Sequence, residues 1–394
     1  MTLGAYLRRL DWLLVAAIGG LLAFGWSTMD ALARSGSSPA PAGRHAIYVL
    51  IGVALGVAVS AIDPRLWRRL LWPAYGLTAV LLVIVLGFAA ARGAQSWIPL
   101  PFFNLQPSEL AKLVLALALA CVVARRERAR PGAWSTVGVA LGITAPLFAL
   151  VFIQPDLGTS VIFVAILLSI LLVAGTRPLP LLLLVGSVAG AVALVLVALP
   201  SAGVRILQDY QVARLTSFLD PAADSTGAGY QQVQSMTVIG SGGIDGAGVG
   251  SVGTAADYLP EEYTDFIFAV IAHERGFVGA ALVLALYALV VWRALRAVAV
   301  ARSLWESLLA AGLTGMLVAQ IFINIAMNMG VAPITGLPLP FLTYGGSNTL
   351  VNLVAAGLIL AVQLRGTLPE PSAVVERAAG RRSGRRLRAS HADR

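Results

Sequence analysis

Charged residues are scarce in this sequence, and their scarcity excludes most classes of soluble protein. Lys, Arg, Asp and Glu make up 12% of the 394 residues, whereas 58% are hydrophobic and the mean hydropathy is +0.84. A soluble domain carries about 25% charged residues. The net charge of +9 does not indicate a nucleic-acid-binding protein, because most arginines flank apolar segments or gather in the C-terminal tail. The composition predicts a protein that crosses a membrane many times.

Cysteine, histidine and lysine are also rare. Cys121 is the single cysteine, so the chain forms no internal disulfide. The three histidines, His45, His273 and His391, lie far apart in the sequence and show no metal-ligand spacing. Lys112 is the single lysine among 28 basic residues. The use of lysine at this one position suggests a specific role for its ammonium group.

Long apolar runs are what the sequence has in abundance. A spanning helix needs about 20 mostly apolar residues, and the candidates are 12–32, 45–62, 70–90, 107–124, 134–154, 157–175, 179–200, 264–292, 306–330 and 348–364. We therefore predict an all-α polytopic membrane protein with about ten transmembrane helices in one domain, 1–365. The first run lacks a small-x-small cleavage site and is predicted to be a retained helix rather than a signal peptide. The basic tail 366–394 is predicted to be disordered.

Arginine placement predicts the orientation, because cytoplasmic loops are enriched in Lys and Arg. With the N-terminus inside, the inner segments hold Arg8, Arg9, Arg65, Arg68, Arg69, Arg125, Arg126, Arg128, Arg130, Arg177, Arg293, Arg296, Arg302 and the arginines of the tail. The outer segments hold only Arg34, Arg44, Arg92, Arg205 and Arg214. We predict that both termini are cytoplasmic and that the polar loop 201–263 faces outward.

Glu109 and Lys112 lie three residues apart within an apolar span, on one face of a helix. An ionisable side chain at membrane depth costs about 2.5–3.5 kcal/mol on the insertion scale. Two interpretations remain open. The residues form a buried structural pair, or Lys112 faces a cavity where a compact ammonium meets a phosphate.

Two further motifs lie between apolar runs. In QPDLGTS (154–160), Asp156 is either a plain helix N-cap or a functional acid. The glycine-rich stretch GSGGIDGAGVGSVG (240–253) has no preceding strand, so it is not a dinucleotide fingerprint. It predicts a loop with sharp turns or close backbone approach.

Three acids crowd the entrance of the eighth apolar run. In YLPEEYTDFIF (258–268), Glu261, Glu262 and Asp265 precede a stretch without charge. Acids at a helix N-terminus complement its dipole, but that explains one acid better than three. In one alternative, Thr264 caps the long helix and Asp265 lies in its first turn. The prolines of VAPITGLPLPFLTYGGS (331–347) forbid regular helix there, and we predict that these irregular segments line one outward-facing cavity.

The motifs together resemble the SEDS family (shape, elongation, division and sporulation). The matching stretches are GAQSWIPLPFFNLQPSELAK (93–112), QPDLGTS (154–160), RLTSFLDPAADSTGAGYQQVQSMTVIGSGG (214–243), LPEEYTDFIFAVIAHERG (259–276) and GLPLPFLTYGGSNTLVN (336–352). They cover most of the transmembrane core in the family's order. MGVAPITGLPLPFLTYGGS (329–347) is similar to the elongation branch of the family more than to its division branch.

The resemblance implies a peptidoglycan glycosyltransferase of ten helices that polymerises lipid II on the outer face of the cytoplasmic membrane. It implies a class B penicillin-binding protein as partner. It also implies an essential carboxylate at Asp265, a cavity lined by Glu109 and Lys112, and a role for Trp97 in an outer loop. The chain departs from the family at Tyr263, where histidine is frequent, and at His273-Glu274, where two glutamates are common.

The chemistry of this reaction suggests roles for the remaining polar residues. Asp265 is the predicted general base for the acceptor hydroxyl, and Glu261 and Glu262 either raise its pKa or shape the loop. Lys112, with Arg205 and Arg214 as weaker candidates, would meet the leaving pyrophosphate. Asp156 completes the predicted substrate-binding set. A divalent cation, Mg²⁺ or Mn²⁺, would suit carboxylates and phosphates, but no spacing specifies one.

Two rival functions fit parts of the pattern. A lipid-linked precursor flippase or other transporter would also have many helices, broken segments and a central cation. We find no internal repeat, however, and the marked residues cluster on one side of the membrane. The third possibility, a non-catalytic scaffold, does not explain Lys112 or the three acids.

Overall fold

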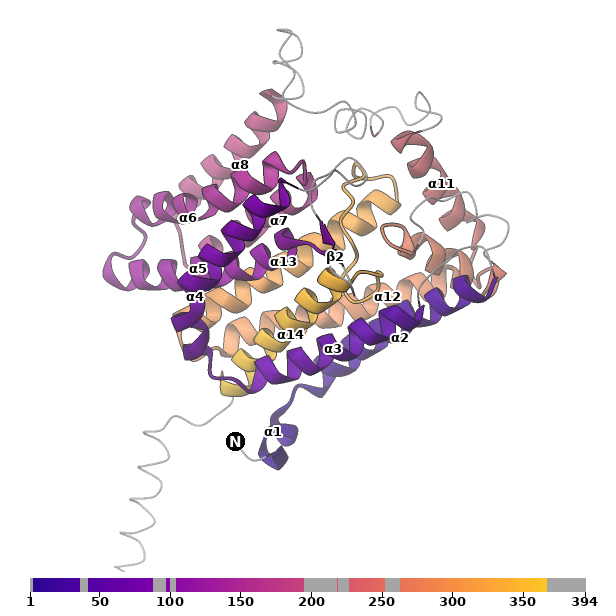
Figure 1. The fold of residues 1–394 in the computed structure, drawn as a ribbon, viewed down its shortest axis with the longest axis horizontal. Coiled ribbons are helices and arrows are strands. Elements are labelled where there is room, and N and C mark those ends of the chain that lie inside the picture. Colours follow the sequence, from indigo (N-terminus) through magenta and orange to yellow (C-terminus); the bar gives the residue numbers. More distant parts are fainter. Residues whose placement is uncertain are drawn as a thin grey trace, which may run out of the picture.

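The computed structural model describes residues 3–35, 42–87, 97–99, 104–194, 218, 227–251 and 263–366. The predicted all-helical architecture is confirmed (Figure 1). The helices are α1 (Leu3–Arg9), α2 (Trp12–Ser35), α3 (Ala42–Ala61), α4 (Pro64–Val85), α5 (Pro107–Ala129), α6 (Trp134–Ile153), α7 (Leu157–Val173), α8 (Pro178–Ala193), α11 (Ala228–Ser241), α12 (Ile267–Val300), α13 (Leu304–Asn328) and α14 (Gly346–Gly366). A two-stranded antiparallel sheet pairs β1 (Ile98–Pro99) with β2 (Asn104–Leu105).

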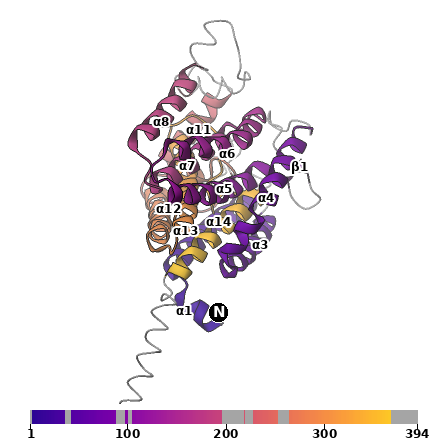
Figure 2. The ribbon, with the colours of Figure 1, turned by 90° about the vertical axis from the view of Figure 1, so that its left-hand side faces the viewer.

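The apolar helices match the predicted spans. Among the described residues, eight helices are long and apolar enough to cross a membrane, and α7 and α8 are shorter apolar helices. Figure 2 shows α8 projecting from one end of the bundle and α1 lying beyond the other. The main difference is at α12, which continues to Val300, eight residues past the predicted end at 292. The prediction stopped just before Arg293, but Arg293 is buried and neutralised within the bundle.

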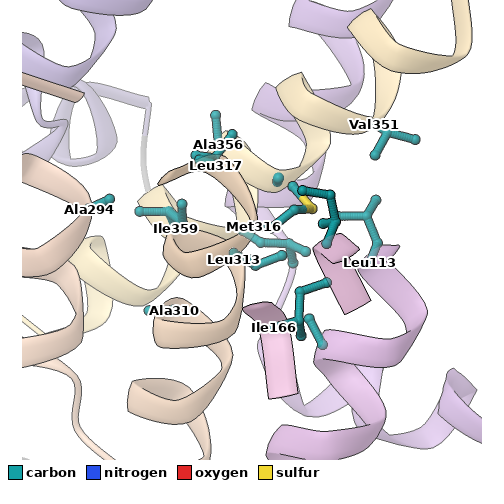
Figure 3. Close-up of a cluster of buried hydrophobic side chains, with 14 of the residues drawn as sticks. Leu113, Ile166, Ala294, Ala310, Leu313, Met316, Leu317, Val351, Ala356 and Ile359 are labelled. Carbon is teal, nitrogen blue, oxygen red and sulfur yellow. The ribbon is translucent and has the colours of Figure 1, made fainter. Parts of the chain in front are cut away.

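Helices α5 and α14 form the centre of the bundle. In each, 83% of the most apolar window is buried, compared with 33% in α6. Leu113, Ile166, Met316 and Val351 gather where α5, α7, α13 and α14 meet (Figure 3). Helix α14 also packs closely on α3, since a Cβ added at Gly357 would lie 2.3 Å from the carbonyl oxygen of Gly56. Small residues of this kind let membrane helices approach each other.

A polar contact ties three helices at the end of the bundle where α2 begins. Arg293 Nε donates to Asp11 Oδ2 at 2.7 Å, and Gln363 Nε2 donates to the same oxygen at 2.6 Å. Burial alone would raise the pKa of Asp11, but its hydrogen bonds to Arg293 and Gln363 outweigh burial and lower it. The contact joins α2, α12 and α14.

The glycine-rich segment docks into a break in α12. Gly276 has non-helical angles (φ 64°, ψ −165°) and interrupts the helix after Arg275. Ala247 N and Gly248 N donate to His273 O and Glu274 O, while Phe277 N and Val278 N donate to Gly243 O and Ile244 O. The segment therefore satisfies backbone groups on both sides of the break. The predicted close backbone approach is confirmed, and the element directly before these glycines is the helix α11 (Ala228–Ser241).

Replacing Gly276 by alanine should destabilise the protein. Its φ/ψ region is essentially restricted to glycine, at a cost of about 1–3 kcal/mol for other residues. The added Cβ would also lie 2.2 Å from Ile244 O. We expect a lower melting temperature in detergent for Gly276→Ala. Gly142→Ala in α6 is the control, because its Cβ meets nothing within 4 Å. Equal melting temperatures for the two variants would contradict this account of the break.

Candidate functional site

Several helix termini meet at one end of the bundle, which we call the site end. Helices α5, α7, α12 and α14 begin there, and α13 ends there. Gln106 N, just before α5, donates to Ser347 Oγ of α14 at 3.0 Å, and Ser347 Oγ donates to Asn104 O of β2 at 3.0 Å. Ser108 at the start of α5 contacts Asp156 at the start of α7. The QPSE, QPDLG and YGGS motifs therefore meet at the site end.

Asp156 holds two helix starts together. Its Oδ1 accepts from Thr159 N at 2.9 Å, which is the N-cap bond of α7. Its Oδ2 accepts from Ser108 Oγ at 2.9 Å and from Gln106 Nε2 at 3.2 Å. The capping interpretation of Asp156 is therefore confirmed, and the carboxylate also fixes α5 relative to α7.

Asp156→Asn separates these two roles. Asparagine caps a helix as well as aspartate does, but its NH₂ group cannot accept from Ser108 and Gln106. A hydrogen bond to a charged group contributes about 1.5–3 kcal/mol, so we expect a loss of roughly that size in detergent unfolding. Asp156→Ala should lose about 1 kcal/mol more, because the cap is removed too. A wild-type melting temperature for Asp156→Asn would leave capping as the whole structural role.

Asp265 lies in the turn 263–266 that leads into α12 and is partly buried. The helix begins at Ile267, and its N-cap is Phe266, which makes no side-chain cap bond. The alternative in which Thr264 caps the helix is therefore wrong. The helix begins two residues later than in that alternative. The backbone carbonyl of Asp265 accepts a hydrogen bond from α13 instead, since Asn324 Nδ2 donates to it at 3.0 Å. Asp265 thus stands at the entrance of α12, outside its hydrogen-bond ladder.

Glu109 and Lys112 form a closed ion pair within the bundle. Lys112 Nζ donates to Glu109 Oε1 at 2.7 Å, and the two side chains are 0% and 1% exposed. Glu109 Oε2 has no partner among the described residues. In this conformation a phosphate has no path to the ammonium. The buried-pair interpretation describes the geometry, and a phosphate contact requires the pair to open.

Trp97 lies just before the β1–β2 hairpin at the site end. It is 37% exposed, and the adjoining β2 is tied to α14 through Ser347. Four predicted site residues, Glu261, Glu262, Arg205 and Arg214, lie outside the described residues. In the described part of the chain, no three His, Cys, Asp or Glu side chains gather as potential metal ligands.

An aromatic cluster next to Asp265 was not predicted. The ring of Tyr344 lies about 6 Å from those of His45, Tyr48 and Tyr263, and Tyr344 N donates to Tyr263 O at 3.2 Å. Burial raises the pKa of Tyr344 to about 12, so its phenol is neutral at pH 7. The cluster packs the loop before α14 against the turn that carries Asp265. A histidine within an apolar segment was the one sequence signal for it.

The arrangement suits proton transfer at a membrane surface. The partly buried residue Asp265 lies at the start of α12, on a turn that is hydrogen-bonded to α13. The aromatic cluster around Tyr344 packs beside this turn. A carboxylate so placed can accept a proton from a hydroxyl group that it contacts. The helix starts around it favour negative charge.

Comparisons with known proteins give consistent matches over most of the chain. A profile of the FtsW/RodA/SpoVE family, described as cell cycle proteins, matches residues 6–367. Stage V sporulation protein E of Bacillus subtilis (strain 168) is 35% identical over 354 residues, covering 89% of this chain and 94% of the relative. The peptidoglycan glycosyltransferase MrdB of Escherichia coli (strain K12) is 36% identical over 316 residues, covering 80% and 83%. A probable peptidoglycan glycosyltransferase FtsW of Halomonas elongata is 36% identical over 367 residues, covering 90% of each.

Solved structures show the same fold. A chain from a peptidoglycan synthase complex that coordinates polymerization and crosslinking superposes with a TM-score of 0.75 at 31% identity, covering 91% of this chain and 99% of that one. The rod shape determining protein RodA of Thermus thermophilus superposes with a TM-score of 0.66 at 28% identity, covering 91% and 98%.

Proposed function

Because the chain belongs to the FtsW, RodA and SpoVE family of cell cycle proteins, we propose that it is a peptidoglycan glycosyltransferase that polymerises lipid II. The observation that carries the proposal is Asp265, a carboxylate held at the helix entrance of the site end. Relatives that are 36% identical over most of the chain carry the name peptidoglycan glycosyltransferase. The multi-pass helical fold suits a substrate whose lipid tail stays in the bilayer.

The proposed step is one displacement with inversion. A sugar hydroxyl of one lipid-linked substrate attacks the anomeric carbon of another. The new C–O bond forms as the bond to undecaprenyl pyrophosphate breaks, and the hydroxyl proton passes to the carboxylate of Asp265. A positioned base typically contributes about 10²–10⁴-fold to such a step. The donor is α-linked and the product β-linked, so no covalent enzyme intermediate is required.

The leaving pyrophosphate needs positive charge. We assign this role to Lys112, once its bond to Glu109 opens, with Arg205 and Arg214 in support. A divalent cation would supply further charge to the phosphates. Carboxylates and phosphates are the ligands that such a cation prefers.

We further propose a role in cell elongation and rod shape, with a class B penicillin-binding protein as partner. The stretch 329–347 resembles the elongation branch, and RodA of Thermus thermophilus shares the fold at 28% identity. Stage V sporulation protein E, FtsW and MrdB are all about 35% identical to this chain, so overall identity does not favour one of them. Arginine placement supports cytoplasmic termini and an outward-facing site end in the cytoplasmic membrane.

Purified protein supplied with labelled lipid II and a class B penicillin-binding protein tests the function. We expect glycan polymer on a gel. A vesicle assay for lipid II translocation serves as the second arm. Translocation without polymer would identify a flippase and overturn the proposal. Absence of both activities from folded protein would favour a scaffold.

A further inference from the structure

Two asparagines at the end of α13 occupy positions that an apolar helix rarely gives to polar side chains. Asn324 and Asn328 are four residues apart, so they share one helical face, and both are 0% exposed. A buried amide is costly unless its atoms are hydrogen-bonded. The contacts of these two amides explain why they are present.

The two side chains bracket the backbone of the turn that carries Asp265. Asn324 Nδ2 and Asn328 Nδ2 donate to the carbonyl oxygen of Asp265 at 3.0 and 3.1 Å. Asn328 Oδ1 accepts at 3.3 Å from Ala269 N, which also donates to Phe266 O at 3.0 Å. Asn328 therefore holds the turn on both sides of Phe266. It satisfies a carbonyl before α12 and is a second acceptor for an amide in the first turn of that helix.

The bracket extends to the proline-rich loop and to α7. Asn324 Nδ2 also donates to Leu337 O at 2.7 Å. Leu337 lies against Gly158, where an added Cβ would be 2.8 Å from Leu337 Cγ. One amide thus sets the distance between Asp265 and the loop that packs on the helix start of Asp156.

Neither amide is available to a substrate. Nδ2 of Asn324 is used by Asp265 and Leu337, and its Oδ1 lies 3.3 Å from Nδ2 of Asn328. No polar atom of either side chain lacks a partner. Asn348 and Asn352 in α14 are also four residues apart, but Asn348 Nδ2 and Asn352 Oδ1 have no partner among the described residues. The α13 pair therefore acts through the backbone that it holds.

We propose that Asn324 and Asn328 are positioning residues that fix the carboxylate of Asp265 for proton transfer. The inference rests on the proposed function, in which Asp265 is the base. Displacing a catalytic group by about 1 Å can cost roughly 10²-fold in rate. A residue that positions the base lowers kcat and leaves substrate affinity nearly unchanged, because its interaction is expressed in the transition state.

The test uses Asn324→Leu and Asn328→Leu in the full-length protein with its penicillin-binding partner. Leucine keeps the branched shape of asparagine but removes both hydrogen-bonding groups. We expect kcat for lipid II polymerisation to fall about 10- to 100-fold, while KM changes less than about threefold. Gln363→Leu is the control, because Gln363 is a buried amide bonded to Asp11 at the opposite end of the bundle. It should lose stability while kcat remains at the wild-type value.

Amide hydrogen exchange supplies a readout that does not depend on activity. In Asn328→Leu, the exchange of Ala269 N–H should accelerate at least about tenfold, since the turn is released from α13 and only the bond to Phe266 O still protects that amide. Faster exchange with an unchanged kcat would overturn the positioning role. An unchanged exchange rate would contradict the claim that Asn328 holds the turn. Wild-type protein that makes no polymer would reject the proposed function, while the exchange result would still decide whether the asparagines hold the turn.

Discussion

Asp265→Asn should abolish glycan polymerisation while the protein folds and binds its penicillin-binding partner normally. Asparagine is nearly isosteric with aspartate but cannot accept a proton near neutral pH. A general base contributes about 10²–10⁴-fold, so we expect polymer to fall by that factor. The measurement is polymer formation from labelled lipid II, with a thermal melt of the same preparation.

The contacts of α13 with the turn survive the change of Asp265 to asparagine. The N-cap of α12 is Phe266, which has no side-chain cap bond. The turn is held through the Asp265 carbonyl, which asparagine retains. A carboxylate at this place also interacts with the helix dipole, which contributes about 0.3–1 kcal/mol. A dipole role alone therefore predicts a slightly lower melting temperature and normal polymer.

Asp30→Asn is the matched control for the charge change. Asp30 lies near the end of α2, at the same end of the bundle, and pairs with Arg34 at 2.5 Å. An exposed pair contributes about 0–1 kcal/mol, so this variant should polymerise normally. Normal polymer from Asp265→Asn would remove the base from the mechanism and make Glu261 and Glu262 the next candidates. If Asp265→Asn lost lipid II translocation in vesicles but kept polymer formation, the protein would be a flippase.

Hydropathy was sufficient to predict most of the fold. Membrane helices bury their backbone hydrogen bonds within themselves, so long apolar runs specify both their existence and their approximate ends. The predicted end of α12 was wrong, because a tertiary contact determines where this helix ends. Helix α12 continues past Arg293 because Asp11, 282 positions earlier in the chain, neutralises it. No local pattern contains that pairing.

The site was predictable in part. Asp156, Asp265, Glu109 and Lys112 attracted notice because polar groups in apolar surroundings are costly. The turn before α12 was not predictable, since it depends on Asn324 and Asn328, which lie about 60 residues later in the chain. The sequence does show two asparagines four residues apart in an apolar run. Their role cannot be inferred from the sequence, because the fold decides which backbone carbonyl needs a hydrogen-bond donor.

Lys112→Met should destabilise the protein strongly, and adding Glu109→Gln should restore stability without restoring polymer. The single variant leaves the Glu109 carboxylate buried and unpaired. Lys112 Nζ is the partner of Oε1 at 2.7 Å, and Oε2 has no partner among the described residues. Breaking a buried pair from one side costs about 3–5 kcal/mol. We expect a correspondingly lower melting temperature in detergent. A melting temperature equal to that of the wild type would contradict the burial of the pair.

The double variant separates the two interpretations of the pair. Replacing both members of a buried ion pair by neutral groups is often neutral for stability or even stabilising, so Glu109→Gln with Lys112→Met should fold. If the pair were only structural, polymerisation would return along with stability. We expect it not to return, since a pair kept for stability alone gains little over two apolar side chains, and the single lysine of an arginine-rich chain stands in this pair. Lys112→Arg should also polymerise poorly, because the planar guanidinium fork cannot replace a compact ammonium. A folded double variant with wild-type polymer would assign Lys112 a structural role and leave the pyrophosphate to Arg205 and Arg214.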